Sequence, residues 1–105
     1  DVRGKICLIV DDIVDTAGTL TNGATALLDN GAKKVASCCT HGVLSGPAIG
    51  RITTSGIEEL IITDTIPLSE DAKSCGKVRV LTVAPLLAEA IKRIYTGSSV
   101  SELFL

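Results

Sequence analysis

The sequence predicts an α/β fold, namely a three-layer, open and mainly parallel sheet with helices on both faces. Short apolar runs rich in branched side chains alternate along the chain with segments of helical periodicity, which is the order of β–α–β units. Of the 105 residues, 46% are hydrophobic but only 2% are aromatic, so the core has to be aliphatic. An aliphatic core suits a parallel sheet covered by helices. The length corresponds to one domain.

The first element is expected to be a buried strand at residues 6–10. Five apolar residues are too few for a free-standing helix, and most of them are branched. We expect the strand to stop against two adjacent carboxylates, Asp11 and Asp12. A third carboxylate, Asp15, and the small-residue turn 16–19 follow it. The beginning of the chain therefore predicts a strand, an acidic turn and a helix start.

The remaining elements follow in order. Leu20, Ala24, Leu27 and Leu28 share one helical face and predict a helix at about 19–30, with Gly31 as its left-handed C-cap. The other expected elements are a strand at 35–40, a helix at 47–54 that Ser45 or Gly46 caps, a strand at 60–63, a helical turn within 68–77, a strand at 78–83, and a helix that opens at Pro85 and ends at Gly97.

The turn after the first strand has the chemistry of an anion site. Gly18 and Ala17 let a ligand approach the backbone, and the amides of residues 16–19 can point together at one phosphate. Two threonine hydroxyls and the positive end of the helix dipole add to this. Each charge-assisted hydrogen bond would contribute about 1.5–3 kcal/mol. Since carboxylates repel phosphate, Asp11 and Asp12 are expected to face hydroxyl groups or Mg²⁺, and the implied ligand is a sugar phosphate.

A structural explanation of the same residues stays open. Aspartate and threonine are common in N-caps and turns, so the aspartate pair alone is equally compatible with a capped helix. The combination of three aspartates with Thr-Ala-Gly-Thr directly after an apolar strand favours the binding site.

The other reactive residue types favour structural roles. His41 is the only histidine, and we expect it to form a hydrogen bond with the backbone of a loop. Asp64 fits a strand-ending turn before Pro67. None of the four cysteines has the spacing of a metal site, so we expect buried, reduced, cytosolic thiols; they are Cys7, Cys38, Cys39 and Cys75.

Charge and hydropathy exclude several classes of partner. The net charge is −2 and both signs are dispersed, so no nucleic-acid or membrane surface is expected. No apolar run approaches the roughly 20 residues of a membrane span, and we expect no signal peptide. We expect a cytoplasmic protein. The chain contains no methionine, and we expect it to be a fragment of a longer polypeptide.

Four segments carry a resemblance to a known family. Residues 10–19 resemble the ribose-phosphate-binding signature of type I phosphoribosyltransferases. Together with residues 40–48, 63–67 and 87–91, in that order, they resemble the carboxyl-terminal part of ribose-phosphate pyrophosphokinases (phosphoribosyl pyrophosphate synthetases). The resemblance covers essentially the whole chain.

The resemblance implies an enzyme that transfers a pyrophosphoryl group from ATP to ribose 5-phosphate with the help of Mg²⁺. It also implies a homo-oligomer. Asp11 and Asp12 would face the ribose hydroxyls and the metal. The 5-phosphate region would be held by Asp15, Thr16, Ala17, Gly18 and Thr19. In this family the catalytic loop and most of the ATP site precede the segment, so residues 1–105 would be an incomplete phosphoribosyltransferase-like domain, inactive alone.

Three alternatives stay open. A salvage phosphoribosyltransferase is disfavoured by residues 45–47 and by the C-terminal block. A non-catalytic synthetase-associated regulatory protein would carry a degraded form of the turn, which is intact here at residues 15–19. The third alternative is a bare assembly module.

The tail also resembles a family feature. Ser99, Ser101 and Phe104 match the segment where the phosphate-activated class binds an allosteric nucleotide or phosphate between subunits. The alternative is that Val100, Leu103 and Phe104 only dock the tail onto the domain.

Overall fold

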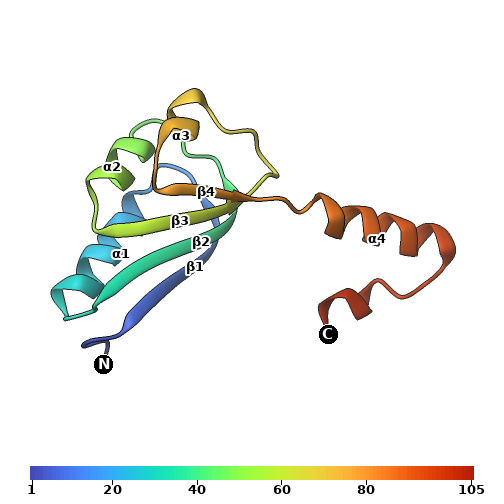
Figure 1. Ribbon diagram of the computed structural model, residues 1–105, viewed down its shortest axis with the longest axis horizontal. Helices are drawn as coiled ribbons and strands as arrows, with labels where there is room; N and C mark the ends of the chain where they lie inside the picture. Colours follow the sequence, from blue (N-terminus) through green and yellow to red (C-terminus); the bar gives the residue numbers. More distant parts are fainter.

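A computed structural model describes residues 1–105 as one parallel four-stranded sheet with helices. The strands follow each other in the order β1-β2-β3-β4 (Figure 1). All three strand pairs are parallel, as the sequence predicts. The elements are β1 (Ile6–Val14), α1 (Gly18–Asp29), β2 (Lys34–Gly42), α2 (Ala48–Thr54), β3 (Ile57–Thr63), α3 (Glu70–Ser74), β4 (Val78–Leu81), α4 (Ala84–Thr96) and a terminal 3₁₀ turn, η1 (Ser101–Phe104).

The expected end of the first strand is wrong by four residues. β1 continues through both aspartates to Val14, because its backbone stays paired with β2 from Ile6↔Lys34 to Val14↔Gly42. β1 is an edge strand, so Asp11 and Asp12 can lie within it and stay exposed to solvent. The acidic turn therefore begins only after Val14.

The boundaries of β2 and β3 differ for the same reason. β2 and β3 begin before the expected residues, and β2 also extends beyond its expected end, where parallel partners continue the ladder. β4 ends at Leu81 rather than at residue 83. The helices lie within two residues of their expected starts, and Gly31 has the left-handed φ, 95°, that a helix end requires.

The core is aliphatic, as expected, and lies on one face of the sheet. α1 and α2 cover this face, and α3 lies beside α2 (Figure 1). Alternate residues of the central strands point into it, and Val35, Leu60 and Ile62 are almost completely buried. Ile52 of α2 and Ala24 of α1 close the core from the helix side. This packing fixes the carboxyl ends of β1 and β2 relative to the start of α1.

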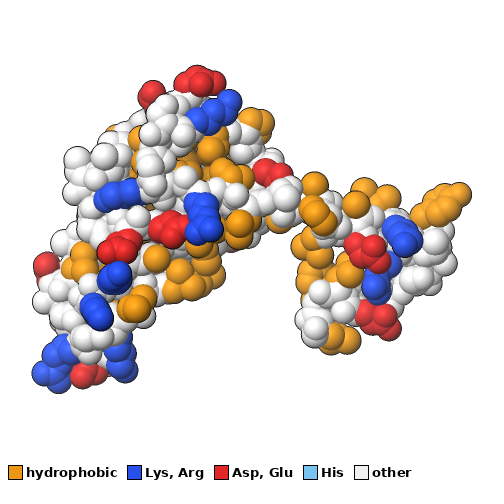
Figure 2. Space-filling view, in the orientation of Figure 1, with side chains coloured by type: hydrophobic (Ala, Val, Ile, Leu, Met, Phe, Trp, Pro, Cys, Tyr) orange, Lys and Arg blue, Asp and Glu red, His pale blue; other side chains and the backbone are white.

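The opposite face of the sheet stays open within these residues. On β1 the side chains of Ile6, Leu8 and Val10 are 70%, 58% and 71% exposed. Figure 2 shows hydrophobic side chains gathered over this part of the sheet and again on the protruding C-terminal part. Thus residues 1–105 do not supply the second helical layer of the expected three-layer architecture.

α4 extends away from the sheet as an arm and buries none of its residues (Figure 1). It is a helix as expected, and Arg93 Nε lies 3.1 Å from Glu89 Oε1, four positions earlier on the same side of the helix. Its apolar stripe is nevertheless exposed, with Ile91 at 67% and Ile94 at 70%. The arm raises the radius of gyration to 16.2 Å, compared with about 13 Å for a compact domain of this length. No helix has the length and apolarity needed to cross a membrane.

Candidate functional site

A hollow of about 250 Å³ lies at the carboxyl end of β1, where an open parallel sheet binds its ligands. It contains every residue of the predicted site except Asp12. Its lining residues are Asp11, Ile13, Val14, Asp15, Thr16, Ala17, Gly18, Thr19 and Leu20.

Free backbone amides dominate this hollow. The N–H groups of residues 16–19 donate to no acceptor within the chain. The N-cap of α1 is Ala17, whose φ is 64°, and the helix has no side-chain cap and no carboxylate in its first turn. The positive end of the helix dipole is therefore uncompensated. This arrangement can accept a phosphate through backbone N–H groups and the adjacent threonine hydroxyls.

The two strand aspartates do not share one side. Successive residues of a strand point to opposite faces, and Asp11 pairs with Cys39 on the helix-covered face. Asp11 lines the hollow, whereas Asp12 does not. The Asp12 amide donates to Asp11 Oδ1 at 2.8 Å. The structure therefore brings Asp11 to the predicted site and leaves Asp12 beside it.

The carboxylates at the hollow could supply only some of the oxygen ligands of a magnesium ion. No group of three or more His, Cys, Asp or Glu side chains is placed to hold a metal ion. Mg²⁺ needs no such cage, because it keeps several waters and binds through one or two carboxylates together with substrate oxygens. The exposed carboxylate of Asp11 at the rim of the hollow fits that mode.

Two residues of the β2–α2 segment contact the turn and were not predicted to do so. The Ser45 hydroxyl donates to Asp15 Oδ1, and Arg51 Nη1 donates to the Thr16 carbonyl at 3.1 Å. The prediction that Ser45 or Gly46 caps α2 is wrong, since Pro47 is the N-cap and no side chain caps the helix. The only signal in the sequence was position, because a loop after β2 ends at the same sheet edge as β1.

His41 and Asp64 both form hydrogen bonds to loops, but the partner of His41 is a side-chain hydroxyl rather than the expected loop backbone. His41 Nδ1 lies 2.7 Å from Thr65 Oγ1 and links the end of β2 to the loop after β3. Asp64 Oδ1 accepts from the Val83 amide at 2.9 Å. Hydrogen bonds from the Thr82 hydroxyl and the Val83 amide lower the pKa of Asp64 below its ordinary value. Neither residue lines the hollow.

All four cysteines are free, as expected, but only one is fully buried. Burial raises the pKa of the Cys39 thiol, and the nearby Asp11 carboxylate acts in the same direction. The other three are half-buried, because they lie near the open face, the edge or a loop of the sheet.

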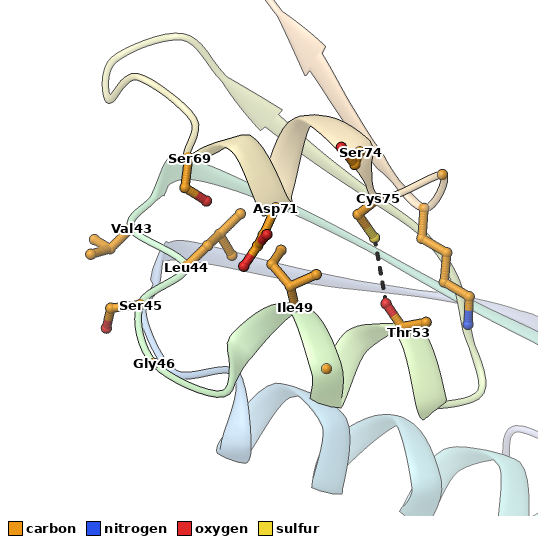
Figure 3. A pocket seen from close by; sticks show the side chains of 13 residues that line it. Val43, Leu44, Ser45, Gly46, Ile49, Thr53, Ser69, Asp71, Ser74 and Cys75 are labelled. Atoms are coloured by element: carbon orange, nitrogen blue, oxygen red, sulfur yellow. Dashed lines mark hydrogen bonds between the residues drawn. The ribbon is translucent and has the colours of Figure 1, made fainter.

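A larger cavity, of about 700 Å³, lies between α2, α3 and the β2–α2 loop (Figure 3). It contains none of the predicted site residues. Leu44 points into it, whereas the Ser45 side chain is turned away from it. On its far side Thr53 Oγ1 lies 3.7 Å from Cys75 Sγ. Lys77 Nζ also lines the cavity but donates to the Ile52 and Ser55 carbonyls at the end of α2.

The predicted tail residues lie together at the end of the arm. Ser99 Oγ and Ser101 Oγ are 2.9 Å apart. Arg93 Nη1 donates to the Ser99 carbonyl at 2.9 Å and lies 3.3 Å from Glu102 Oε2. Phe104 is 71% exposed, so the tail folds back on α4 rather than docking onto the sheet domain.

The comparisons with known proteins agree on one family. Residues 1–105 match the family model described as the phosphoribosyl synthetase-associated domain. The ribose-phosphate pyrophosphokinase of Caldanaerobacter subterraneus subsp. tengcongensis is 60% identical over 104 residues, 99% of this chain and 33% of that protein. The ribose-phosphate pyrophosphokinase of Xanthomonas axonopodis pv. citri is 58% identical over 105 residues, 100% of this chain and 33% of that protein.

A solved structure gives the same result. The crystal structure of phosphoribosylpyrophosphate synthetase from Mycobacterium smegmatis is similar with a TM-score of 0.88 and 43% sequence identity, covering 93% of this chain and 33% of that chain. The chain thus spans about a third of the length of these relatives. Because the family model matches its whole length, the chain belongs to the phosphoribosyl synthetase-associated domain family.

Proposed function

We propose that this chain is the ribose 5-phosphate-binding part of a ribose-phosphate diphosphokinase. Such an enzyme transfers pyrophosphate from ATP to ribose 5-phosphate and supplies phosphoribosyl pyrophosphate for nucleotide biosynthesis. The observation that carries the proposal is the run of free amides at residues 16–19 beside an exposed carboxylate. The names of the similar proteins support a pyrophosphokinase rather than a salvage transferase. Residues 1–105 would be the carboxyl-terminal portion of a phosphoribosyltransferase-like domain.

Different residues of the hollow would contact the phosphate and the ribose of the ligand. The amides of residues 16–19 and the hydroxyls of Thr16 and Thr19 would hold the 5-phosphate. Asp11, and Asp12 beside it, would accept hydrogen bonds from ribose hydroxyls and take part in holding Mg²⁺. When bound, Mg²⁺ would neutralise charge on the phosphoryl groups. The chain's own contribution is therefore to orient the acceptor sugar.

The chain alone is not expected to catalyse the transfer. No lysine or arginine side chain lines the hollow. Phosphoryl transfer from ATP depends on cationic groups that stabilise the transferring phosphates. We propose that most of the ATP site is supplied by other parts of the enzyme. Turnover of ATP and ribose 5-phosphate by the pure, mass-verified 105-residue chain would contradict this.

The binding function is tested with the chain itself. Ribose 5-phosphate is titrated into ¹⁵N-labelled chain, and the amide shifts of residues 16–19 are followed. The sample carries Leu8→Lys and Ile91→Lys, because charges at these exposed apolar positions outside the hollow oppose self-association. These amides should shift and saturate with ribose 5-phosphate, should respond more weakly to inorganic phosphate, and should not respond to ribose. If ribose 5-phosphate leaves the turn unchanged, the alternative of a regulatory or assembly module gains the stronger support.

We also propose a regulatory role for the tail. The adjacent hydroxyls of Ser99 and Ser101 can donate to a phosphate group, and Phe104 is free to contact a nucleotide base or another subunit. The Glu102 carboxylate would repel an anion, but it forms an ion pair with Arg93. The test is the Ser99→Ala and Ser101→Ala variant of the full enzyme. If ADP inhibition and phosphate activation both survive unchanged in a stable protein, these serines have no regulatory part.

The proposal also includes the location of the protein in the cell and its oligomeric state. Four free cysteines suit a reducing compartment, which supports a cytoplasmic location. The exposed apolar side chains of β1 and α4 support a homo-oligomer.

A further inference from the structure

Two residues with strained backbones lie in the two segments that meet at the end of β1. Ala17 and Leu44 are the only non-glycine residues of the chain with positive φ, at 64° and 53°. A left-handed backbone is unfavourable for both, and such strain persists only where the surrounding structure enforces it. Ala17 belongs to the turn of the proposed phosphate site, and Leu44 belongs to the loop after β2. The two strained positions are joined by hydrogen bonds between their segments.

Three successive carbonyls, the last of β1 and the next two of the chain, accept hydrogen bonds from residues 43–51, which are called the β2–α2 segment here. The donors come from the backbone of residues 43–45 and from one arginine side chain. Val14 O accepts from Val43 N at 3.0 Å and Leu44 N at 3.2 Å, Asp15 O accepts from Ser45 N at 3.0 Å, and Thr16 O accepts from Arg51 Nη1 at 3.1 Å.

These bonds determine where the next N–H groups point. In a planar trans peptide the C=O of one residue and the N–H of the next point in opposite directions. Holding the carbonyls of residues 14–16 towards the β2–α2 segment therefore turns the N–H groups of residues 15–17 to the other side. None of these three N–H groups donates to an acceptor in the chain. The segment thus presets consecutive donors for a ligand.

Side chains reinforce the same arrangement from both sides of the loop. The Leu44 side chain is 6% exposed and points into the space between α2 and α3, which anchors the loop (Figure 3). On the opposite side the Ser45 hydroxyl donates to Asp15 Oδ1 and fixes that carboxylate. Arg51 reaches from α2, and its Nη1 would lie 3.1 Å from a Cβ added at Gly18. A larger residue at position 18 would therefore displace the guanidinium.

We propose that Ser45 and Arg51 are positioning residues that set the turn 15–19 in its phosphate-binding conformation before the ligand arrives. This inference rests on the proposed function, and it adds two residues that act through the turn rather than on the substrate. Because the turn is ordered before the ligand arrives, binding does not lose the conformational entropy of ordering it. The binding free energy is more favourable by that entropy term.

The experiment compares the order of the turn and its affinity in the 105-residue chain, with Leu8→Lys and Ile91→Lys present in every sample. Both residues are exposed and lie outside the hollow, and the added charges oppose self-association at NMR concentrations. Ser45→Ala and Arg51→Gln each remove one contact, Ser45→Thr keeps the hydroxyl, and Arg79→Gln is the control. Arg79 is exposed and pairs with Glu59 at 3.0 Å, outside the hollow, so the control removes the same charge. The ¹⁵N order parameters of residues 15–17 are measured without ligand, and the Kd for ribose 5-phosphate is measured by titration.

The proposal predicts that Ser45→Ala and Arg51→Gln lower the order parameters of residues 15–17 and raise the Kd roughly five- to twentyfold, the range expected for one hydrogen bond. Ser45→Thr and Arg79→Gln should match the parent chain in both. If affinity falls while the order parameters stay unchanged, the two residues act by charge or contact, and the inference is overturned. If the parent chain does not bind ribose 5-phosphate, the proposed function fails, and the order parameters alone decide whether the two residues position the turn.

Discussion

Thr19 stands in the first turn of α1 with an exposed side chain at the hollow. Replacing it with valine keeps the branched shape but removes the hydroxyl donor. We expect Thr19→Val to weaken ribose 5-phosphate binding by about 1 kcal/mol, close to a fivefold rise in Kd. The free energy of unfolding should change by less than about 0.5 kcal/mol, since the site is on the surface. Isothermal titration and urea unfolding measure the two quantities.

The matched control for Thr19 is Thr25→Val on the same helix. The Thr25 hydroxyl bonds to the Thr21 carbonyl at 3.0 Å and lies outside the hollow, so its loss should leave the Kd unchanged. Equal weakening by both substitutions would mean that the threonines act on the helix and not on the ligand. The turn would then be a structural feature of the kind that aspartate and threonine commonly form.

The extent to which single residues could be predicted depends on how local their contacts are. The turn 15–19 was found from sequence because its donors lie on consecutive residues. Ser45 and Arg51 were missed because their partners lie 30 and 35 positions away, a distance that no local pattern encodes. Asp12 was grouped with Asp11 because the strand was expected to end before them. A strand that continues separates neighbouring side chains to opposite faces.

At the scale of elements, the sequence predicts whether a segment is a strand or a helix. It does not predict which faces of these elements are buried. Each expected strand and helix exists, because runs of branched residues and helical periodicity are properties of the local sequence. Strand ends depend on the neighbouring strand, which explains why β1 continues to Val14. The apolar stripe of α4 has no partner within residues 1–105. An apolar stripe shows that a helix needs a partner without showing where it is.

The junction between β4 and α4 is held by a carboxylate whose effect depends on pH. Asp64 at the end of β3 accepts from Val83 just before α4. Its folded-state pKa is lowered from 3.8 by the Thr82 and Val83 hydrogen bonds. A lowered pKa means that the ionised carboxylate stabilises the junction above the unfolded-state pKa. This stabilisation is lost as the pH falls through the folded-state pKa.

We expect the Asp64 carboxyl to titrate below 3.8 in a carbon-detected NMR experiment. Asp64→Ala should lower the protection of the Val83 amide against hydrogen exchange at neutral pH, with each rate compared with the intrinsic rate at the same pH. It should also remove the further loss of protection that the parent shows in acid. Asp29→Ala, at the end of α1, removes one carboxylate without touching the junction and serves as the control. A Val83 amide that exchanges at the same rate in the parent and in Asp64→Ala would show that the bond does not hold the arm.

At the scale of the whole molecule, two apolar surfaces of one chain stay apart. One is the open face of β1, formed by Ile6, Leu8 and Val10, and the other is the stripe of α4 around Ile91 and Ile94. Figure 2 shows hydrophobic side chains both on the sheet and on the protruding arm, which Figure 1 draws as α4. β1 also has an unpaired edge, because no strand lies beyond it in the sheet. Unpaired edges and exposed apolar faces both favour association.

We therefore expect the isolated 105-residue chain to self-associate on the order of tens of micromolar, the range in which exposed apolar surfaces and strand edges become association-prone. Leu8→Lys on the open face and Ile91→Lys on the arm should each lower the mean mass measured by light scattering, because each places a charge in an apolar surface that must be buried. Thr25→Lys on α1 adds the same charge at an exposed polar position and should not change the mass. If only Leu8→Lys acts, the sheet face alone drives association; if only Ile91→Lys acts, the arm does. A parent chain that remains a monodisperse monomer at these concentrations would contradict the prediction, since both surfaces would then tolerate water without a partner.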